Sequence, residues 1–152
     1  MKLAFSAALA ALLLTACGEK LSVEQQIIAT LQVMEEAAEQ GEHFEFMGYV
    51  ADSFSGQYGS MDRREFHRFM IFQINQNRRL HAQFFPIYVQ ETDKNQASAH
   101  FKLLVTGGAG LLPESGRLFE VETQWLLDGS DWVLEKADWE AMQLPDIPTG
   151  KK

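Results

Sequence analysis

The sequence predicts an α+β domain in which a curved antiparallel sheet wraps around about three N-terminal helices. Apolar residues recur at helical spacing between residues 22 and 77. From residue 80 to residue 142 they alternate with polar residues, which is the period of half-buried strands. Helices followed by a run of strands form the element order of α+β domains rather than of parallel α/β sheets. We expect four long strands and one short strand.

Residues 1–16 predict a secretory signal peptide. Lys2 supplies a positive charge, and Leu3–Leu14 is an apolar run shorter than the about 20 residues that a membrane-spanning helix needs. The run ends in Leu14-Thr15-Ala16-Cys17, which resembles the lipobox of bacterial lipoproteins. The alternative is an ordinary signal peptide followed by an incidental cysteine. Cys17 is the single cysteine of the chain, which favours the lipobox.

The lipobox resemblance implies that Cys17 is the lipid attachment site. Its thiol would carry a diacylglyceryl group, and its amine, freed by cleavage, would carry a further acyl chain such as palmitate. The mature protein would then be anchored in the bacterial cell envelope, with residues 17–21 as a short tether. Gly18 stands where an aspartate would favour the inner membrane, so we expect the outer membrane and its periplasmic face.

The first helix is predicted to begin with a capping box at Ser22–Gln25 and to stop at Gly41. A second, shorter helix is expected over His43–Val50, followed by a short strand or extended turn over Ala51–Gly59. One apolar stripe follows the first helix; it consists of Val23, Ile27, Leu31, Met34 and Ala38.

A second long helix is predicted from Ser60 to about Asn77, with Asp62 and Glu65 in its first turn. It is apolar around more than half of its circumference, so we expect other elements to cover it on most sides. The apolar residues are Phe66, Phe69, Met70, Phe72 and Ile74.

Four strands are predicted after this helix, and Asp128-Gly129 predicts a hairpin between the last two. Pro86 implies that the first of them is an edge strand or carries a bulge. The loop Gly107–Gly116 contains an apolar Leu-Leu-Pro segment that we expect to pack on the domain itself; the alternative is contact with a partner or the bilayer. We expect residues 143–152 to form a loose tail. The strands are His81–Gln90, Gln96–Thr106, Arg117–Leu127 and Asp131–Met142.

This layout resembles the nuclear transport factor 2-like (NTF2-like) superfamily, including its SnoaL-like branch, over residues 22–142. The residues that carry the resemblance are Val50–Phe54 after the second helix, and Trp132–Leu134 with Ala137–Trp139 near the end. The resemblance implies a cone-shaped interior that aromatic side chains either fill or leave partly open. The superfamily includes enzymes, transport factors and binding domains, so the fold alone does not decide the function.

Ketosteroid isomerases of this superfamily use a tyrosine and two aspartates, whose positions fall near Met34, Gln57 and Thr123 in this chain. None of these three residues can perform the required proton transfer. The resemblance therefore favours a non-catalytic module that binds a small apolar ligand or a protein. The alternative is a small-molecule isomerase, cyclase or hydratase that uses a non-standard set of catalytic residues.

That alternative set consists of Asp52, Tyr58 and His67, although the position of Asp52 just behind a helix suits a turn or cap better than catalysis. The resemblance also implies a pocket inside the cone, and we expect five residues to line it. They are Met34, Gln57, Tyr58, Thr123 and Trp125.

Charge and composition limit the partners. Removal of residues 1–16 takes away Lys2, so 12 basic against 21 acidic side chains leave a net charge of -9, which repels nucleic acid. No two of the four histidines have metal-ligand spacing, and we expect neither a metal nor a cofactor. A homodimer could form through the open sheet face. The residues expected on that face are Glu120, Glu122, Gln124 and Leu126.

Overall fold

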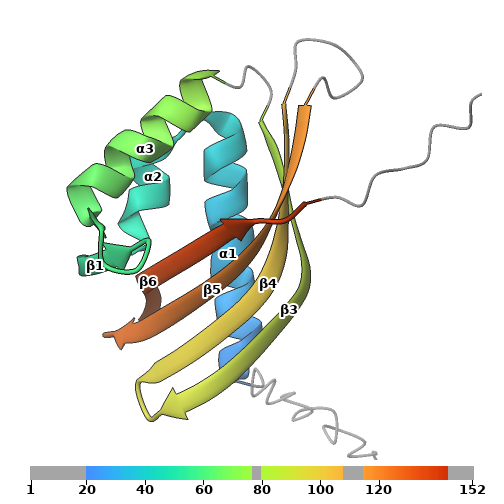
Figure 1. The fold of residues 1–152 in the computed structure, drawn as a ribbon. Helices are drawn as coiled ribbons and strands as arrows, with labels where there is room; N and C mark the ends of the chain where they lie inside the picture. The colour runs from blue at the N-terminus through green and yellow to red at the C-terminus, as the bar shows by residue number, and fades with distance from the viewer. Residues whose placement is uncertain (1–19, 77–79, 108–114, 144–152) are drawn as a thin grey trace, which may run out of the picture.

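The computed structural model describes residues 20–76, 80–107 and 115–143. The predicted signal peptide, Cys17, residues 108–114 of the predicted loop and residues 144–152 of the predicted tail lie outside these ranges. Three helices come first, interrupted by two short strands, and four long strands follow. The predicted α+β architecture is therefore confirmed, with the sheet curving around α1 and the other helices gathered toward one end (Figure 1).

One six-stranded sheet forms the body of the domain, with the strand order β2-β1-β6-β5-β4-β3. The four long strands pair antiparallel, as predicted. Their neighbour β1 pairs parallel to β6, so the sheet is mixed rather than antiparallel throughout. The strands are β1 (Val50–Gly56), β2 (Met61–Asp62), β3 (His81–Asp93), β4 (Gln96–Gly107), β5 (Ser115–Asp128) and β6 (Asp131–Ala141).

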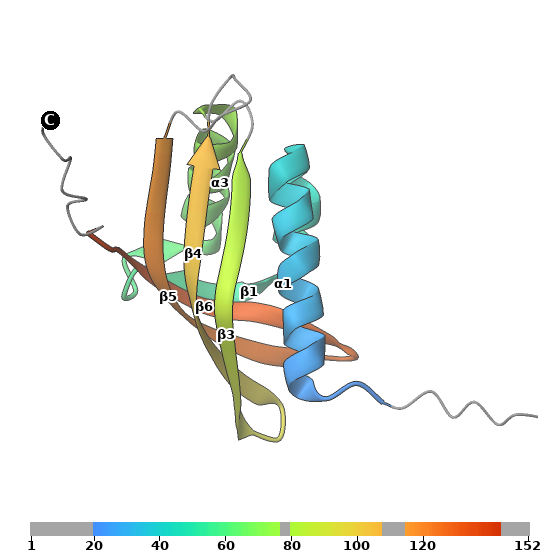
Figure 2. The ribbon, with the colours of Figure 1, turned by 90° about the vertical axis from the view of Figure 1, so that its right-hand side faces the viewer.

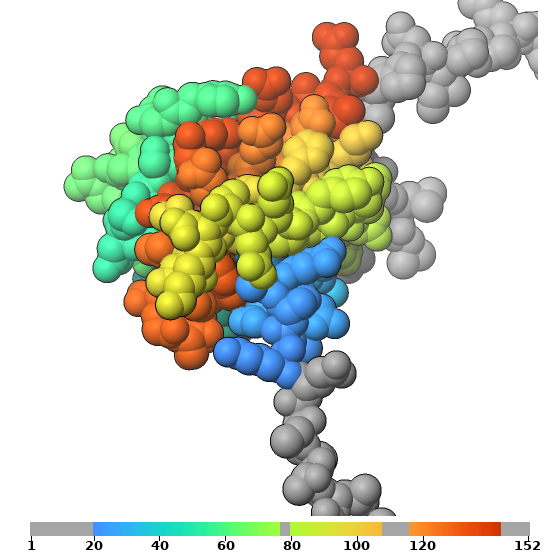
Figure 3. Space-filling view, turned by 90° about the horizontal axis from the view of Figure 1, so that it is seen from below, coloured from blue at the N-terminus to red at the C-terminus, as the bar shows by residue number. Residues whose placement is uncertain are grey.

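The first helix, α1 (Val23–Gln40), has the predicted capping box and stop. The Ser22 hydroxyl accepts a hydrogen bond from the Gln25 backbone N–H, and the Gln25 side chain accepts one from the Ser22 N–H. Gly41 ends the helix with a φ of 79°, a left-handed conformation that glycine adopts without a steric penalty. The predicted apolar stripe faces the core, and α1 lies alongside β3 (Figures 2 and 3).

Replacement of Ser22 by alanine is expected to lower the free energy of unfolding by about 1 kcal/mol, because it removes one half of the capping box. Urea unfolding followed by circular dichroism would measure the change. Ser130→Ala, at an exposed position outside the helices, is the control and should have little effect. Equal stability of Ser22→Ala and the wild type would contradict the role of this cap.

The end of the second helix and the start of the third differ from the prediction. Helix α2 (His43–Gly48) ends two residues earlier than expected. Helix α3 (Arg63–Gln76) begins after Ser60, because the Asp62 carboxylate accepts a hydrogen bond from the Glu65 N–H and so caps the helix at Asp62. The hydroxyl of Ser60 is used in the preceding turn, where it donates to the Gln57 carbonyl.

Strand β3 lies at the edge of the sheet, and its pairing with β4 is irregular between Phe85 and Tyr88. Pro86 lies within that irregularity. Proline lacks the N–H that a ladder requires, so an edge position with an interrupted register is where a strand tolerates it. The prediction from Pro86 is confirmed.

The hydrophobic core lies between α1 and the concave face of the sheet. Trp125 and Ile27 are fully buried at its centre. The alternating apolar residues of β4 and β5 face this core, which confirms the predicted strand faces. Phe54, Phe66 and Trp132 belong to the same core cluster, in which the rings of Phe54 and Phe66 stack.

Helix α3 is much less covered than predicted. Phe66 is its one buried residue, and 57% of Phe72 is exposed. The expectation that other elements cover α3 on most sides was wrong. Its remaining apolar side chains border an open space instead of a packed interior, and this space is the main candidate for a functional site.

Candidate functional site

A cavity of about 600 Å³ opens between α1, α3 and the concave face of the sheet. Its lining is mainly apolar. The inner faces of the four long strands contribute to it, together with the helices. Five polar side chains contribute to it: Glu35, Gln73, Gln76, Arg117 and Thr123. The volume and the apolar lining are typical of pockets that hold a small organic molecule.

The exposure of the lining residues shows which end of the cavity is open. Phe72, Gln76 and Arg117 are exposed and mark the mouth. Thr123 and Ala137 are buried and belong to the interior. Arg117 and Thr123 are six residues apart on β5, so the wall extends about 20 Å from mouth to interior.

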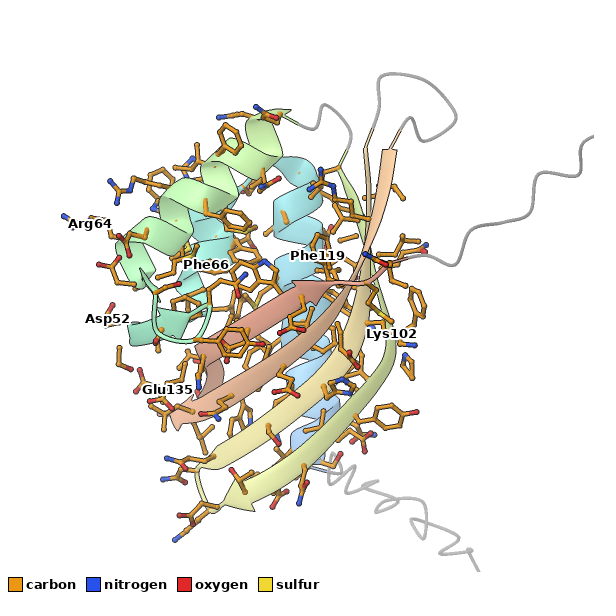
Figure 4. The ribbon with its side chains drawn as sticks, in the orientation of Figure 1. Asp52, Arg64, Phe66, Lys102, Phe119 and Glu135 are labelled. Carbon is orange, nitrogen blue, oxygen red and sulfur yellow. The ribbon has the colours of Figure 1, made fainter. Side chains whose placement is uncertain are left out.

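Aromatic side chains form much of the wall. Phe66 on α3 and Phe119 on β5 point into the space between the helix and the sheet (Figure 4). The ring of Trp139 lies 6.0 Å from that of Phe66 and 5.5 Å from that of Phe69, measured between centroids. These rings provide a large, rigid apolar surface.

Thr123 places a hydroxyl in the wall, but that hydroxyl is already engaged. It donates a hydrogen bond to the Ala99 carbonyl at 3.0 Å and accepts one from Trp125 Nε1 at 2.8 Å. The buried indole N–H of Trp125 thereby finds a partner, as buried polar groups generally do. The role of this threonine is therefore to complete the core.

Glu35, on α1, is the one carboxylate among the described residues of the cavity wall. Burial raises the pKa of the Glu35 carboxyl above its ordinary value, and the neighbouring Glu39 carboxylate raises it further. Glu35 was not among the residues predicted from the sequence to line a pocket. Its position next to Met34, on the margin of the apolar stripe, is the signal that could have identified it.

The predicted pocket residues divide into three groups. Met34 and Thr123 lie in the cavity wall. Trp125 is fully buried outside the lining, and its indole N–H donates a hydrogen bond to Thr123. Gln57 and Tyr58 lie outside the lining of the cavity.

Gln57 and Tyr58 instead form a left-handed turn, with φ values of 50° and 57°. The turn is attached to β6 by hydrogen bonds. The Tyr58 N–H donates to Asp138 at 2.6 Å, and the Gln57 side chain donates to the Trp139 carbonyl at 3.3 Å. The Tyr58 hydroxyl donates to Glu140, and this hydrogen bond raises the pKa of Tyr58. Both residues thus have evident structural roles.

The alternative catalytic set of Asp52, Tyr58 and His67 does not gather around the cavity. Asp52 is fully exposed and lies 3.7 Å from Arg63 Nε (Figure 4). His67 instead pairs with His43, with 2.9 Å between His67 Nε2 and His43 Nδ1. The ring of Phe44, 76% exposed, lies against both histidines.

Burial lowers the pKa of His67, and the neighbouring His43 and Arg63 lower it further. The folded chain therefore binds fewer protons at this site than the unfolded chain as the pH falls through about 6.5, the ordinary histidine value. The free energy of unfolding should decrease as the pH falls from that value toward the lowered pKa of folded His67.

We expect His67→Gln to make the free energy of unfolding depend less steeply on pH in this window. The decrease in slope should correspond to less than one proton taken up on unfolding. Urea unfolding at a series of pH values between about 5 and 8 would measure the slope. His81→Gln, at a histidine on β3, is the matched control. Identical slopes for His67→Gln and the wild type would contradict the assignment.

The outer face of the sheet is mixed: polar side chains of β5 lie there beside the half-buried Leu126 and the exposed ring of Tyr88. Glu120, Glu122 and Gln124 are exposed there, as predicted from their alternation on β5. His100 lies 3.1 Å from Glu120 across the β4–β5 ladder. A homodimer through this face stays a prediction.

Among the described residues, no three histidine, cysteine, aspartate or glutamate side chains are grouped to hold a metal ion. Within the same part of the chain, no helix combines the length and the apolar character needed to cross a bilayer.

The sequence matches no protein-family model and no curated protein. Solved structures nevertheless share the fold. One is a protein of the NTF2-like family from Streptomyces avermitilis, provisionally assigned as a dehydratase, with 15% identity and a TM-score of 0.68 over 80% of this chain and 96% of that one. Another is a protein of unknown function with a cystatin-like fold from Nostoc punctiforme, with 15% identity and a TM-score of 0.65 over 86% and 98%.

A third similarity is to Bd1075 of Bdellovibrio bacteriovorus, with 8% identity and a TM-score of 0.67. It covers 78% of this chain but 41% of that one, so the present chain spans less than half of that protein. At these identities the likeness establishes the fold. The chain has the NTF2-like, cystatin-like fold that its sequence predicted.

Proposed function

We propose that this protein binds a small apolar molecule in its cavity, without catalysis, while Cys17 anchors it by lipid to the bacterial cell envelope. The observation that carries the proposal is the open apolar cavity of about 600 Å³. Apolar surface exposed to water is unfavourable, and a ligand that covers the side chains of α3 and the sheet would gain about 25 cal/mol per Å² of apolar surface removed from water.

The polar groups of the wall support binding rather than catalysis. In the described part of the wall, Glu35 is the one carboxylic acid, and burial raises its pKa. Thr123 is engaged in the core, and the predicted alternative residues lie elsewhere. General acid–base catalysis of the isomerase type uses at least two groups placed around the reacting atoms.

The experiment places a larger side chain inside the cavity and measures ligand binding; the control places the same side chain on the opposite face of the same strand, β4. Val105 lines the cavity, whereas its neighbour Leu104 faces the other side of β4. We expect Val105→Phe to weaken binding of N-phenyl-1-naphthylamine, an uncharged fluorescent apolar probe, by about tenfold or more, and Leu104→Phe to leave it unchanged. The protein would be the full mature chain, residues 17–152, made unlipidated by Cys17→Ser.

Saturable binding that Val105→Phe selectively weakens would support the proposal. Absence of saturable binding, or equal binding by both variants and the parent chain, would contradict it. Thermal unfolding of each variant would show whether the substituted chain is folded.

Glu35 favours a second candidate function, a reaction of the dehydratase type. A partly buried carboxyl with a raised pKa can act as a general acid or base, and the structural neighbour from Streptomyces avermitilis carries a provisional dehydratase assignment. Native mass spectrometry of molecules that copurify with the wild type and with Glu35→Gln would test this function. A dehydratase would yield bound compounds that differ by one water between the two proteins, whereas a binding protein would yield the same compound.

A further inference from the structure

We propose that the ligand is a single-chain amphiphile with an anionic head group, which Arg117 binds at the mouth while the chain lies along the cavity. This inference deepens the proposed function and rests on it. The head group would be a carboxylate or a phosphate monoester, because both match the donors of a guanidinium.

Arg117 is placed to receive an anion. It is an exposed residue of the lining, near the start of β5, at the open end of the cavity. No hydrogen bond or ion pair joins its side chain to any other residue in the ranges 20–76, 80–107 and 115–143. Its charge is therefore available to a ligand within the described structure.

The wall beyond Arg117 is apolar for the length of a chain. Phe119 and Val121 follow it on the same face of β5, and Leu103 lies beside Phe119 on β4. The next polar group on this face is Thr123, whose hydroxyl is already paired. A ligand with one charged end and an extended apolar body matches this order of charge and apolar surface.

The net charge of the protein does not explain such a preference. The mature chain carries 12 basic and 21 acidic side chains, a balance of -9 that disfavours anions in general. Glu35 is the second charged group of the lining, on α1, and it would favour a cationic head group instead. An anionic preference would therefore require a local contact, which we assign to Arg117.

The test compares four ligands of equal chain length, each below its micellar concentration. They are dodecanoate, dodecyl phosphate, dodecanol and dodecyltrimethylammonium. Displacement of N-phenyl-1-naphthylamine from the full mature chain carrying Cys17→Ser would report each affinity. Arg117→Gln is the test variant. Arg64→Gln is the matched control, because Arg64 is also an exposed arginine but lies on α3 pointing away from the cavity (Figure 4).

We expect one or both anions to bind about tenfold more tightly than dodecanol, and Arg117→Gln to remove that difference while Arg64→Gln retains it. Preference for dodecanoate over dodecyl phosphate, or the reverse, identifies the head group. Equal binding of the anions and dodecanol, preference for the cation, or an anionic preference that survives Arg117→Gln would overturn the inference and leave the cavity function standing. If none of the four ligands nor the probe binds, both the inference and the proposed function fail.

Discussion

Replacement of Trp125 by alanine is expected to lower the free energy of unfolding by about 3–5 kcal/mol, the range measured for removing a large aromatic side chain from a core. Trp125 is fully buried, in contact with the central cluster between α1 and the sheet. Its loss would leave a cavity and would also remove the hydrogen bond that its indole donates to Thr123. The reduction is a large fraction of the about 5–15 kcal/mol that stabilises a typical domain.

Chemical denaturation of the full mature chain would measure this loss. Trp125→Phe separates the two contributions, since it retains most of the apolar volume but removes the indole N–H; we expect a smaller reduction of about 1–2 kcal/mol. Phe72→Ala, at an exposed aromatic residue, is the control and should cost much less. A loss below about 1 kcal/mol for Trp125→Ala would contradict the assignment of Trp125 to the core.

Replacement of Cys17 by serine is expected to move the mature protein from the membrane fraction to the soluble fraction. A serine hydroxyl would not accept the diacylglyceryl group that the lipobox implies for the thiol. Each buried methylene contributes about 0.8 kcal/mol to membrane binding, and several acyl chains together hold a protein durably. The loss of all of them should abolish the anchor.

Membrane fractionation with mass spectrometry of the recovered chain would check this prediction. The mass separates cleaved protein from precursor that retains the apolar residues 1–16 and would remain in the membrane for that reason. Thr15→Ser is the matched control, because it keeps a small side chain beside the expected cleavage site and should stay lipidated. Cleaved Cys17→Ser protein that still fractionates with membranes would show that the lipid is not the anchor.

Much of the fold could be predicted from the sequence because the signals were local. The capping box at Ser22, the stop at Gly41 and the alternation along β4 and β5 each depend on neighbouring residues. The edge position of β3 followed from one missing N–H, that of Pro86. These features are decided by backbone geometry and by the separation of apolar and polar faces.

The candidate site was harder to predict, because its residues come from different elements. Of the residues predicted to line a pocket, Met34 and Thr123 lie in the cavity wall, whereas Gln57 and Tyr58 belong to a turn attached to β6. Glu35 and Arg117 were not identified, since nothing in the local pattern shows that two residues so far apart in sequence border one space.

The sequence by itself determined the element types, the α+β class, the faces of the strands and the expectation of a lipidated Cys17. The tertiary structure alone decided that β1 joins β6 in parallel and that α3 leaves its apolar side uncovered. The physical reason is that apolar periodicity shows which face of an element avoids water, but not whether protein atoms fill the space that this face borders. Here that space is an open cavity of about 600 Å³.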